Sequence, residues 1–316
     1  MAKKRHESSH METAPPVNYQ MTIKTQFIGH LCQNPSDIDK LFNLIHCQFD
    51  PRDRILWCWQ DDPEKLCFTL DLLSELLQLF ATVKRSWSAR MGPTFPFHYL
   101  VHGSRNSGVF NLGGDLALFV QLIRAGDTEG LRSYARLCID AVYQNHTKSE
   151  LPYLSAALIQ GDALGGGFES ALSNDIIVAE EHCRFGLPES LFNMFPGMGA
   201  YSFLSRKVGA KIAGNMILSG RLYTAQDLHD LGLIDLVVPT GEGEVALRGY
   251  LDQARRHQHQ NRVSLSRISR RCEGIDYDEL VDIADIWVEQ AMGVSKKDLR
   301  HMERLVYAQQ RKHGKA

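Results

Sequence analysis

The chain has 316 residues, of which 44% are hydrophobic and 23% are charged, and its formal net charge at pH 7 is −2. This composition is typical of a soluble globular protein with one large hydrophobic core or two small ones. The near-neutral charge gives no reason to expect nucleic-acid binding or a membrane-surface role. No apolar run reaches the roughly 20 residues needed to span a bilayer, so no membrane-spanning helix is expected.

The first segment, residues 1–18, is polar and has no charged stretch followed by an apolar block, so no secretory signal is visible. Its run Ser9-His10-Met11 is typical of a cloning junction ahead of a native Met11. A natural disordered arm is the alternative, and both place the segment outside the fold. The seven cysteines are scattered without a C-x-x-C pair, which indicates reduced thiols in a cytoplasmic protein.

Thirteen histidines raise the question of a metal site, but no H-E-x-x-H motif is present. His98 and His102 have H-x-x-x-H spacing, yet they are expected to run from a strand into a turn, where no helix face aligns them. His257 and His259 lie in a polar run and are expected at a solvated surface. We therefore expect no metal and no other bound cofactor.

Predicted strands alternate with predicted helices, which indicates an α/β architecture. Thr224-Ala-Gln-Asp227 resembles an N-capping box that opens a short helix ending at Gly232. In chain order, the other predicted elements are a strand at Arg54–Trp59, a helix at Leu70–Leu79, a strand at Phe97–Val101, helices at 115–124 and 128–146, strands at Ser155–Ile159, Asp175–Ala179 and Leu233–Val238, and a long amphipathic segment at 278–312. We divide the ordered chain into a core, residues 19–240, and a helical region, residues 241–316, suited to oligomer contacts.

Two glycine-rich turns each lie between a predicted strand and a predicted helix, at Phe110–Leu116 and Gln160–Ser170. Glycine permits close backbone approach, and the start of a helix presents free N–H groups at the positive end of its dipole. Two such N–H groups converging from separate turns would form an oxyanion hole for a polarised carbonyl. For either turn alone, glycines that only let the chain turn tightly are the alternative. Neither turn fits a phosphate-binding motif.

Two glutamates accompany these turns. Glu169 falls three residues after Gly166, in the first turn of the predicted helix, and Glu189 follows Pro188 after a predicted strand. Two nearby carboxyls in an apolar pocket tend not to ionise together, so one can serve as an acid while the other stays a base. The sequence does not assign these roles. Asp115 is expected to cap a helix and Ser170 to be an ordinary helical residue.

The order of these elements is more specific than any one of them. It comprises Phe110-Asn-Leu-Gly-Gly-Asp-Leu116, Ala163-Leu-Gly-Gly-Gly-Phe-Glu169, Glu189, Phe195-Pro-Gly-Met-Gly199, Ser219-Gly-Arg-Leu-Tyr-Thr-Ala225 and Gly232-Leu-Ile-Asp-Leu-Val-Val-Pro239. With this pattern, the stretch from about 97 to 239 resembles the crotonase (enoyl-CoA hydratase) superfamily. The resemblance implies an α/β crotonase fold, a superhelical core of repeated ββα units, with a C-terminal helical subdomain.

Further runs, Leu191-Phe-Asn-Met-Phe-Pro-Gly-Met-Gly-Ala-Tyr-Ser-Phe203, Ile286-Trp-Val288 and Leu305-Val-Tyr-Ala-Gln309, are similar to diffusible-signal-factor synthases of the RpfF type. This resemblance implies that Glu169 and Glu189 are the catalytic acids and that the N–H groups of Gly114 and Gly166 form the oxyanion hole. It implies dehydration of a 3-hydroxyacyl thioester, carried on the 4'-phosphopantetheine of acyl carrier protein or on coenzyme A. Hydrolysis would then release a free cis-2-unsaturated fatty acid, a quorum-sensing signal.

An acyl substrate needs an apolar tunnel, and six residues are candidates for its lining: Leu191, Phe192, Met194, Phe195, Trp287 and Met292. Core packing explains each of them equally well. The acidic acyl carrier protein would dock on a basic cluster, either Lys84-Arg85 with Arg90 or Arg206-Lys207 with Lys211, and an ordinary solvated surface is the alternative for both clusters. The resemblance further implies binding to the receiver domain of a sensor kinase, and a homo-oligomer, either a trimer or a dimer of trimers.

Two other kinds of function stay open at this point. An ordinary crotonase that acts on coenzyme A esters, as a hydratase, an isomerase or a thioesterase, would use the same pair of glutamates. A protein that binds and restrains a partner, with vestigial catalysis, is the other alternative. Both glutamates and both glycine turns are present, which favours an active enzyme.

Overall fold

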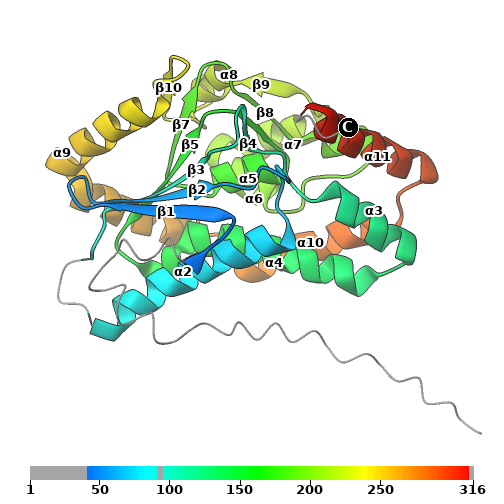
Figure 1. The fold of residues 1–316 in the computed structure, drawn as a ribbon, viewed down its shortest axis with the longest axis horizontal. Helices are drawn as coiled ribbons and strands as arrows, with labels where there is room; N and C mark the ends of the chain where they lie inside the picture. Colours follow the sequence, from blue (N-terminus) through cyan, green and yellow to red (C-terminus); the bar gives the residue numbers. More distant parts are fainter. Residues whose placement is uncertain (1–40, 91–94, 313–316) are drawn as a thin grey trace, which may run out of the picture.

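The computed structural model describes residues 41–90 and 95–312. The expected arm or cloning remnant, residues 1–18, lies outside these residues. Two sheets form the centre of the molecule (Figure 1). The larger has the strand order β1-β2-β3-β5-β7-β10, and the smaller has the order β4-β6-β8-β9. The strands are β1 (Ile45–Asp50), β2 (Ile55–Gln60), β3 (Tyr99–Ser104), β4 (Val109–Asn111), β5 (Leu154–Ile159), β6 (Asp162–Leu164), β7 (Ile176–Glu180), β8 (Arg184–Gly186), β9 (Leu222–Thr224) and β10 (Leu236–Val238).

In the larger sheet, β1 and β2 form an antiparallel pair, and the remaining neighbours pair in parallel. Helices between the strands fill the crossover connections that parallel pairing requires, and further helices follow the last strand. They are α2 (Leu70–Arg90), α3 (Leu116–Ala125), α4 (Thr128–Thr147), η2 (Lys148–Glu150), α5 (Gly166–Leu172), η3 (Pro188–Phe192), α6 (Ala200–Val208), α7 (Ala210–Ser219), α8 (Ala225–Asp230), α9 (Gly243–Cys272), α10 (Tyr277–Met292) and α11 (Lys296–Lys312). In Figure 1, α2, α4 and α10 lie together below the sheets, while α9 lies at the opposite end from α3 and α11.

Local sequence explains where the helices near the two turns begin and end. Asp115 caps α3, because its side chain accepts a hydrogen bond from the N–H of Leu118, and α3 ends at Gly126 with φ of 69°. The expected capping role of Asp115 is therefore confirmed. The capping box at α8 is confirmed as well, since Thr224 and Asp227 exchange side-chain to backbone hydrogen bonds.

The larger sheet separates two hydrophobic clusters, because successive side chains of a strand point to opposite faces. Along β3, Leu100 packs in the cluster that contains the helices α2 and α4, whereas Tyr99 and Val101 pack in the other cluster. That second cluster includes Leu247 and Leu251 of α9. The helical region is thus packed against the core: α9 covers β5 and β7, α10 packs on α4, and α11 packs on α3.

The predicted strands at Arg54–Trp59, Ser155–Ile159 and Asp175–Ala179 are confirmed as β2, β5 and β7, each displaced by no more than one residue. The predicted helices at 115–124 and 128–146 are confirmed as α3 and α4. The two helices directly follow a capping aspartate, Asp115 or Asp127, which explains why the pattern located their starts well.

Several boundaries were wrong. The helix that starts at Leu70 continues to Arg90, and β3 starts at Tyr99 rather than Phe97. The last strand, β10, starts at Leu236 rather than Leu233, because the Leu233 N–H bonds back to the end of α8. The segment 278–312 is two helices, α10 and α11, because Ser295 caps α11 with a reciprocal bond to Asp298.

The expectation of a solvated His259 was also wrong. Its ring stacks on that of His98 with 4.0 Å between centroids, and the Nδ1 atoms of both rings are buried. The contact forms because α9, which carries His259, packs on one face of the larger sheet, and His98 directly precedes β3 of that sheet. The side chain of His257 lies outside the described residues.

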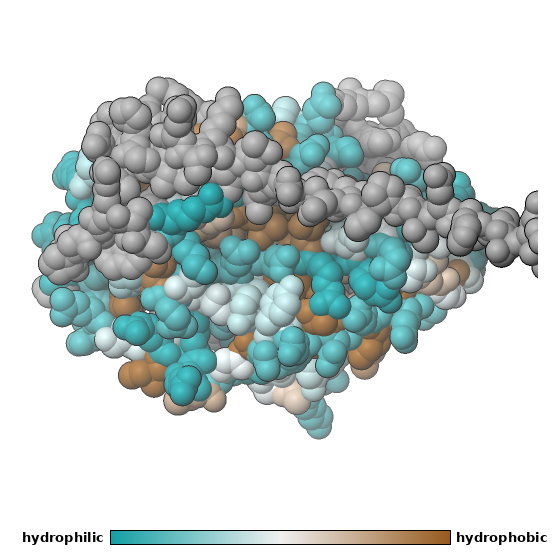
Figure 2. Space-filling model, turned by 90° about the horizontal axis from the view of Figure 1, so that it is seen from below, coloured by the Kyte–Doolittle hydropathy of each residue, from teal (hydrophilic) through white to brown (hydrophobic). Residues whose placement is uncertain are grey.

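The described surface that Figure 2 shows, on the side of α2 and α4, is largely hydrophilic with separate hydrophobic patches. Within residues 41–90 and 95–312, none of the helices combines the length and the apolar character that crossing a membrane requires. Six of the seven cysteines are described, and none of these six forms a disulfide bond.

Candidate active site

The first glycine turn follows β4 and is held in place on both sides. The side chain of Asn111 accepts a hydrogen bond from the Gly113 N–H at 2.8 Å, and the Gly113 carbonyl accepts one from Phe68 at 2.7 Å. Gly113 has φ of +96°, a conformation that favours glycine. The next residue, Gly114, is thereby fixed immediately before the N-cap of α3.

The second glycine turn links β6 to α5 and lies against the first. Gly165 has φ of 51° and ψ of −126°, and its N–H bonds to the Gly186 carbonyl at 2.8 Å. A Cβ atom on Gly113 would lie only 2.9 Å from the Gly166 nitrogen. The two turns therefore touch through backbone alone, which explains why glycine occupies these positions.

Gly114 and Gly166 both present their N–H groups where nothing in the described part of the chain accepts a hydrogen bond from them. For Gly166 the reason is local, since the first residue of a helix has no intrahelical partner for its N–H group. Both residues line one cavity. The structure thus brings the two predicted oxyanion donors to a common wall.

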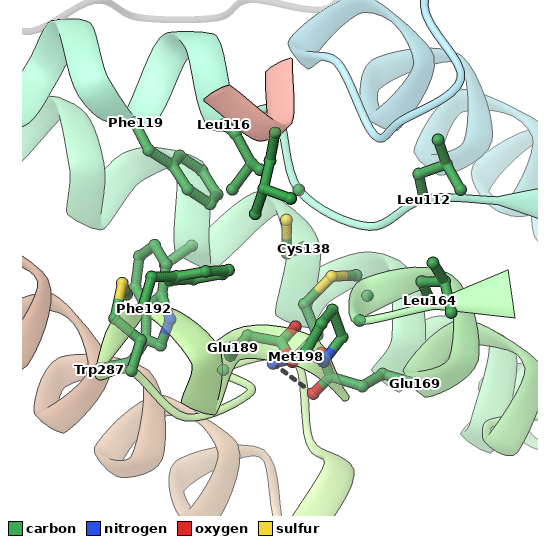
Figure 3. A pocket seen from close by; sticks show the side chains of 18 of the residues that line it. Leu112, Leu116, Phe119, Cys138, Leu164, Glu169, Glu189, Phe192, Met198 and Trp287 are labelled. Carbon is green, nitrogen blue, oxygen red and sulfur yellow. Dashed lines mark hydrogen bonds between the residues drawn. The ribbon is translucent and has the colours of Figure 1, made fainter. Parts of the chain in front are cut away.

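Glu169 projects into this cavity from the first turn of α5 and is 1% exposed. Its Oε1 accepts hydrogen bonds from the Met198 N–H at 2.8 Å and from the Ala200 N–H at 2.9 Å. Figure 3 shows the Glu169 carboxyl group with its hydrogen bond to Met198. The run Phe195–Gly199, which was noted in the sequence only for its resemblance to the superfamily, thus helps to position the Glu169 carboxyl through Met198.

Glu189 reaches the same cavity from η3, directly after Pro188 at the start of that turn. Its Oε1 lies so close to Gly165 that any side chain on that glycine would collide with it. Its Oε2 is buried and has no hydrogen-bond partner among the described residues. The labelled carboxyl groups of Glu189 and Glu169 point toward the same part of the cavity (Figure 3).

Burial raises the pKa of both carboxyls above the ordinary range of glutamate. For Glu169, the nearby charge of Glu189 raises the pKa further, while the two N–H donors act in the opposite direction. The pair therefore retains a proton at a pH where isolated glutamates have lost theirs. A pair that shares a proton near neutral pH can supply an acid and a base together.

The cavity between the two turns, here called the central cavity, has a volume of about 160 Å³. Its wall is largely apolar, and its polar groups include the two glutamates, the backbone of the turns, the Tyr134 hydroxyl and the Cys138 thiol. The residues that line it are Leu112, Gly114, Leu116, Phe119, Tyr134, Ala135, Cys138, Leu164, Gly165, Gly166, Glu169, Pro188, Glu189, Leu191, Phe192, Met194, Gly197, Met198, Trp287 and Leu305.

A family model described as enoyl-CoA hydratase/isomerase matches residues 61–266 of the sequence. The chain belongs to this family. The predicted α/β crotonase fold is thereby confirmed, and so is the predicted membership of the crotonase superfamily. The solved enoyl-CoA hydratase of Bacillus halodurans superposes with a TM-score of 0.68 at 21% identity, covering 83% of this chain and 100% of that chain.

Among curated proteins, the chain is 35% identical over 153 residues to the mitochondrial methylglutaconyl-CoA hydratase of Mus musculus, which covers 48% of each chain. It is 45% identical over 84 residues to the 2,3-dehydroadipyl-CoA hydratase of Escherichia coli (strain K12), covering 27% of this chain and 33% of that protein. The chain spans less than half the length of the curated relatives it matches first.

In this crotonase, four of the six residues named for the acyl tunnel line the central cavity: Leu191, Phe192, Met194 and Trp287. Phe195 and Met292 do not line it and pack instead, partly buried, against the core. Met292 follows Trp287 by five residues, which turns its side chain by about 140° around the helix. Phe195 is the chain neighbour of Met194 and points elsewhere.

The sequence analysis did not predict the other side chains of the wall as lining of the tunnel, although some of them lie in the runs quoted for the resemblance. Leu116 and Phe119 share one face of α3 by their spacing, and this signal could have found them. Met198 lies inside the matched run Phe195–Gly199. Leu305 comes from α11, far along the chain, and no local pattern marks it as a neighbour of Glu189.

The raised pKa values of the two glutamates have a consequence for stability. A carboxyl whose pKa is higher in the folded than in the unfolded state binds its proton more tightly when folded, so its contribution to stability falls as pH rises. From about pH 5 to about pH 8, we expect the free energy of unfolding of the double variant Glu169→Gln/Glu189→Gln to fall less than that of the wild type. Denaturant titrations at both pH values measure this difference.

Comparison with the double variant is needed because burial lowers the pKa values of His98 and His146, and this acts in the opposite sense. Glu181→Gln, at an exposed position, is the matched control and should retain the wild-type dependence. Equal slopes in the wild type and the double variant would contradict the assignment of raised pKa values to this pair.

Proposed function

We propose that the protein dehydrates a 3-hydroxyacyl thioester and then hydrolyses the cis-2-enoyl thioester to a free fatty acid, as a synthase of the diffusible-signal-factor type. The observation that carries the chemistry is the pair of glutamates facing one apolar cavity, beside two backbone N–H groups without other acceptors. The finer substrate assignment rests on the sequence runs shared with RpfF-type synthases. No bound cofactor is needed for either step.

In the dehydration step, the base glutamate would remove the proton from C2 of the substrate. Negative charge would collect on the thioester oxygen, where the N–H groups of Gly114 and Gly166 can stabilise it. The acid glutamate would protonate the 3-hydroxyl group, which leaves as water while the C2–C3 double bond forms. One proton is taken up and one is delivered, so the pair ends with the roles of its members exchanged.

In the hydrolysis step, a glutamate would take a proton from water as the water oxygen attacks the thioester carbonyl. The same two N–H groups would hold the oxygen of the tetrahedral intermediate. The carrier thiolate would leave and receive the proton, releasing the free acid. Ser170 is an ordinary residue of α5, so no serine nucleophile is invoked.

Simple hydration of an enoyl-CoA ester is the second candidate. The observation that favours it is that the curated relatives are named as hydratases. The same pair of glutamates would run the addition of water across C2 and C3. The two candidates differ in the carrier and in whether the thioester bond is broken.

Mass spectrometry of products from matched 3-hydroxyacyl thioesters, one set on acyl carrier protein and one on coenzyme A, would separate the two. We expect a free cis-2-enoic acid, formed faster from the carrier protein. Interconversion of trans-2-enoyl-CoA with its hydrate, without free acid, would reject the synthase and leave the hydratase.

The proposed partners follow from the synthase assignment: acyl carrier protein, the receiver domain of a sensor kinase, and further copies of this chain in a trimer or a dimer of trimers. Of the two basic clusters, the one around Lys207 has lost one cation, because Arg206 pairs with Glu279 through two bonds of 3.0 and 2.8 Å. A cytoplasmic location is part of the same proposal.

A further inference from the structure

A second cavity lies at the far end of α5, where the ends of α4 and α6 meet α9. It has a volume of about 250 Å³ and shares no lining residue with the central cavity. We call it the α9 cavity. Its polar lining includes Lys207, Arg262, Arg270, His146 and Ser269, with Asp175 as its carboxylate. Nothing in the proposed reaction uses these residues.

The α9 cavity carries a surplus of positive charge, because its carboxylate is already neutralised from behind. The ammonium group of Lys148 is 0% exposed and lies 2.9 Å from Asp175 Oδ2. The other oxygen of Asp175 accepts a hydrogen bond from Ser266 at 2.6 Å. Arg270 stands 3.8 Å from the same carboxylate. Two buried cations thus share one aspartate.

The other two cations of the cavity, Lys207 and Arg262, do not remove this surplus of positive charge. Lys207 and Arg262 lie near Asp235, whose pKa they lower against the larger effect of burial. Asp235 already accepts a hydrogen bond from the Ile177 N–H at 2.7 Å. Four cations therefore surround two carboxylates, and an anion would complete the site.

Unused hydrogen-bond donors point to the same conclusion. The Nε atoms of Arg262 and Arg270 are buried donors for which none of the described residues is an acceptor, and the Nε2 atom of His146 is buried without a hydrogen-bond partner among these residues. The side chain of Arg270 is only 8% exposed. Buried donors on charged groups are costly to leave unpaired, and they are therefore normally satisfied by a partner.

The backbone behind the cavity is strained in a way that keeps Lys148 buried. Three consecutive residues, Lys148, Ser149 and Glu150, have φ values of 52°, 49° and 62°. This left-handed conformation is unfavourable for residues other than glycine. It turns the Lys148 ammonium group inward, against Asp175 and the His146 carbonyl. Without Lys148, Asp175 would neutralise Arg270 and the surplus of charge would shrink.

We propose that the α9 cavity binds a phosphate group, either as inorganic phosphate or as a phosphate monoester. Two guanidinium groups, an ammonium group, an imidazole and a hydroxyl present more donors than a carboxylate can accept, and they match the oxygens of a phosphate. The site is separate from the proposed catalysis, and the proposal stands whichever thioester is the substrate.

Calorimetric titration of the full chain with inorganic phosphate and with glycerol 3-phosphate tests this, against potassium chloride at equal ionic strength. We expect saturable binding of one probe or both, and the tighter probe identifies the source. Lys207→Gln and Arg262→Gln should each weaken binding about tenfold or more. Lys211→Gln, an exposed lysine of α7 outside the cavity, should bind as the wild type does.

Two results would overturn the proposal. One is the absence of saturable binding in the wild type beyond the chloride control. The other is unchanged affinity in both Lys207→Gln and Arg262→Gln. Lys207 is exposed, so its variant is expected to fold even where Arg262, which also bonds to the Tyr250 hydroxyl, contributes to packing.

Discussion

Replacing Glu169 or Glu189 by glutamine is expected to lower kcat by about 10²–10⁴-fold, the usual contribution of a positioned acid or base. Glutamine keeps the size of the side chain and removes the ability to exchange a proton. Because each glutamate would act in a different proton transfer, each single variant should lose activity. Turnover of 3-hydroxyacyl thioesters on both carriers measures the effect.

Glutamine is a better probe than alanine at position 169. Its side-chain oxygen can still accept the N–H groups of Met198 and Ala200, whereas alanine would leave both buried donors unpaired. Each such loss costs roughly 1–3 kcal/mol of folding stability. An inactive alanine variant would therefore not separate a lost proton transfer from a destabilised fold. Glu181→Gln, at an exposed position, is the control that should keep wild-type activity. Wild-type turnover in either cavity variant would remove that glutamate from the mechanism.

Alanine at Gly166 is expected to lower kcat by about 10²–10³-fold, the effect of losing one oxyanion donor. The added Cβ would stand 2.5 Å from the sulfur of Met198 and 3.3 Å from the Cα of Gly113. Met198 is flexible and can move, but the Gly113 backbone cannot do so without shifting the first turn. The two N–H groups would then no longer face one point.

The measurement is kcat beside KM for the same thioester, since a misaligned oxyanion hole lowers kcat more than it weakens substrate binding. Gly214→Ala in α7 is the matched control, because a Cβ there meets nothing within 4 Å. Its activity should be unchanged and its helix slightly stabilised. Equal kcat in the wild type and in Gly166→Ala would exclude the Gly166 N–H from charge stabilisation.

The sequence predicted the two turns and both glutamates because their chemistry is local. A helix that starts at a glycine, with a glutamate in its first turn, has the same geometry wherever it occurs. The convergence of the turns was different: that Gly113 nearly touches the Gly166 nitrogen depends on the parallel pairing of β4 with β6. The family resemblance implied only that the N–H groups of Gly114 and Gly166 converge, and no spacing in the chain encodes the strand pairing that brings them together.

The lining of the cavity was predictable only in part for a related reason. Apolar residues on a helix look the same whether they face a core or a substrate, and only their direction separates the two. Trp287 and Met292 lie on one helix, yet only Trp287 faces the cavity. Leu305 shows the other limit, since α11 reaches η3 through tertiary contacts, including the bond between His301 and the Leu191 carbonyl. The break between α10 and α11 at Gly293 lets α11 turn back toward η3, and the sequence marks this break only weakly.

The hydrogen bonds of Glu169 also bear on the stereochemistry of the product. With Oε1 occupied by two backbone amides, only Oε2 is left to exchange a proton. Glu189 likewise has Oε1 packed over Gly165 and a buried Oε2 without a partner among the described residues. One reactive oxygen on each carboxyl means that protons arrive and depart along fixed directions. The base glutamate should therefore remove only one of the two hydrogens at C2, so that a substrate deuterated stereospecifically at C2 keeps or loses its label according to which hydrogen carries it.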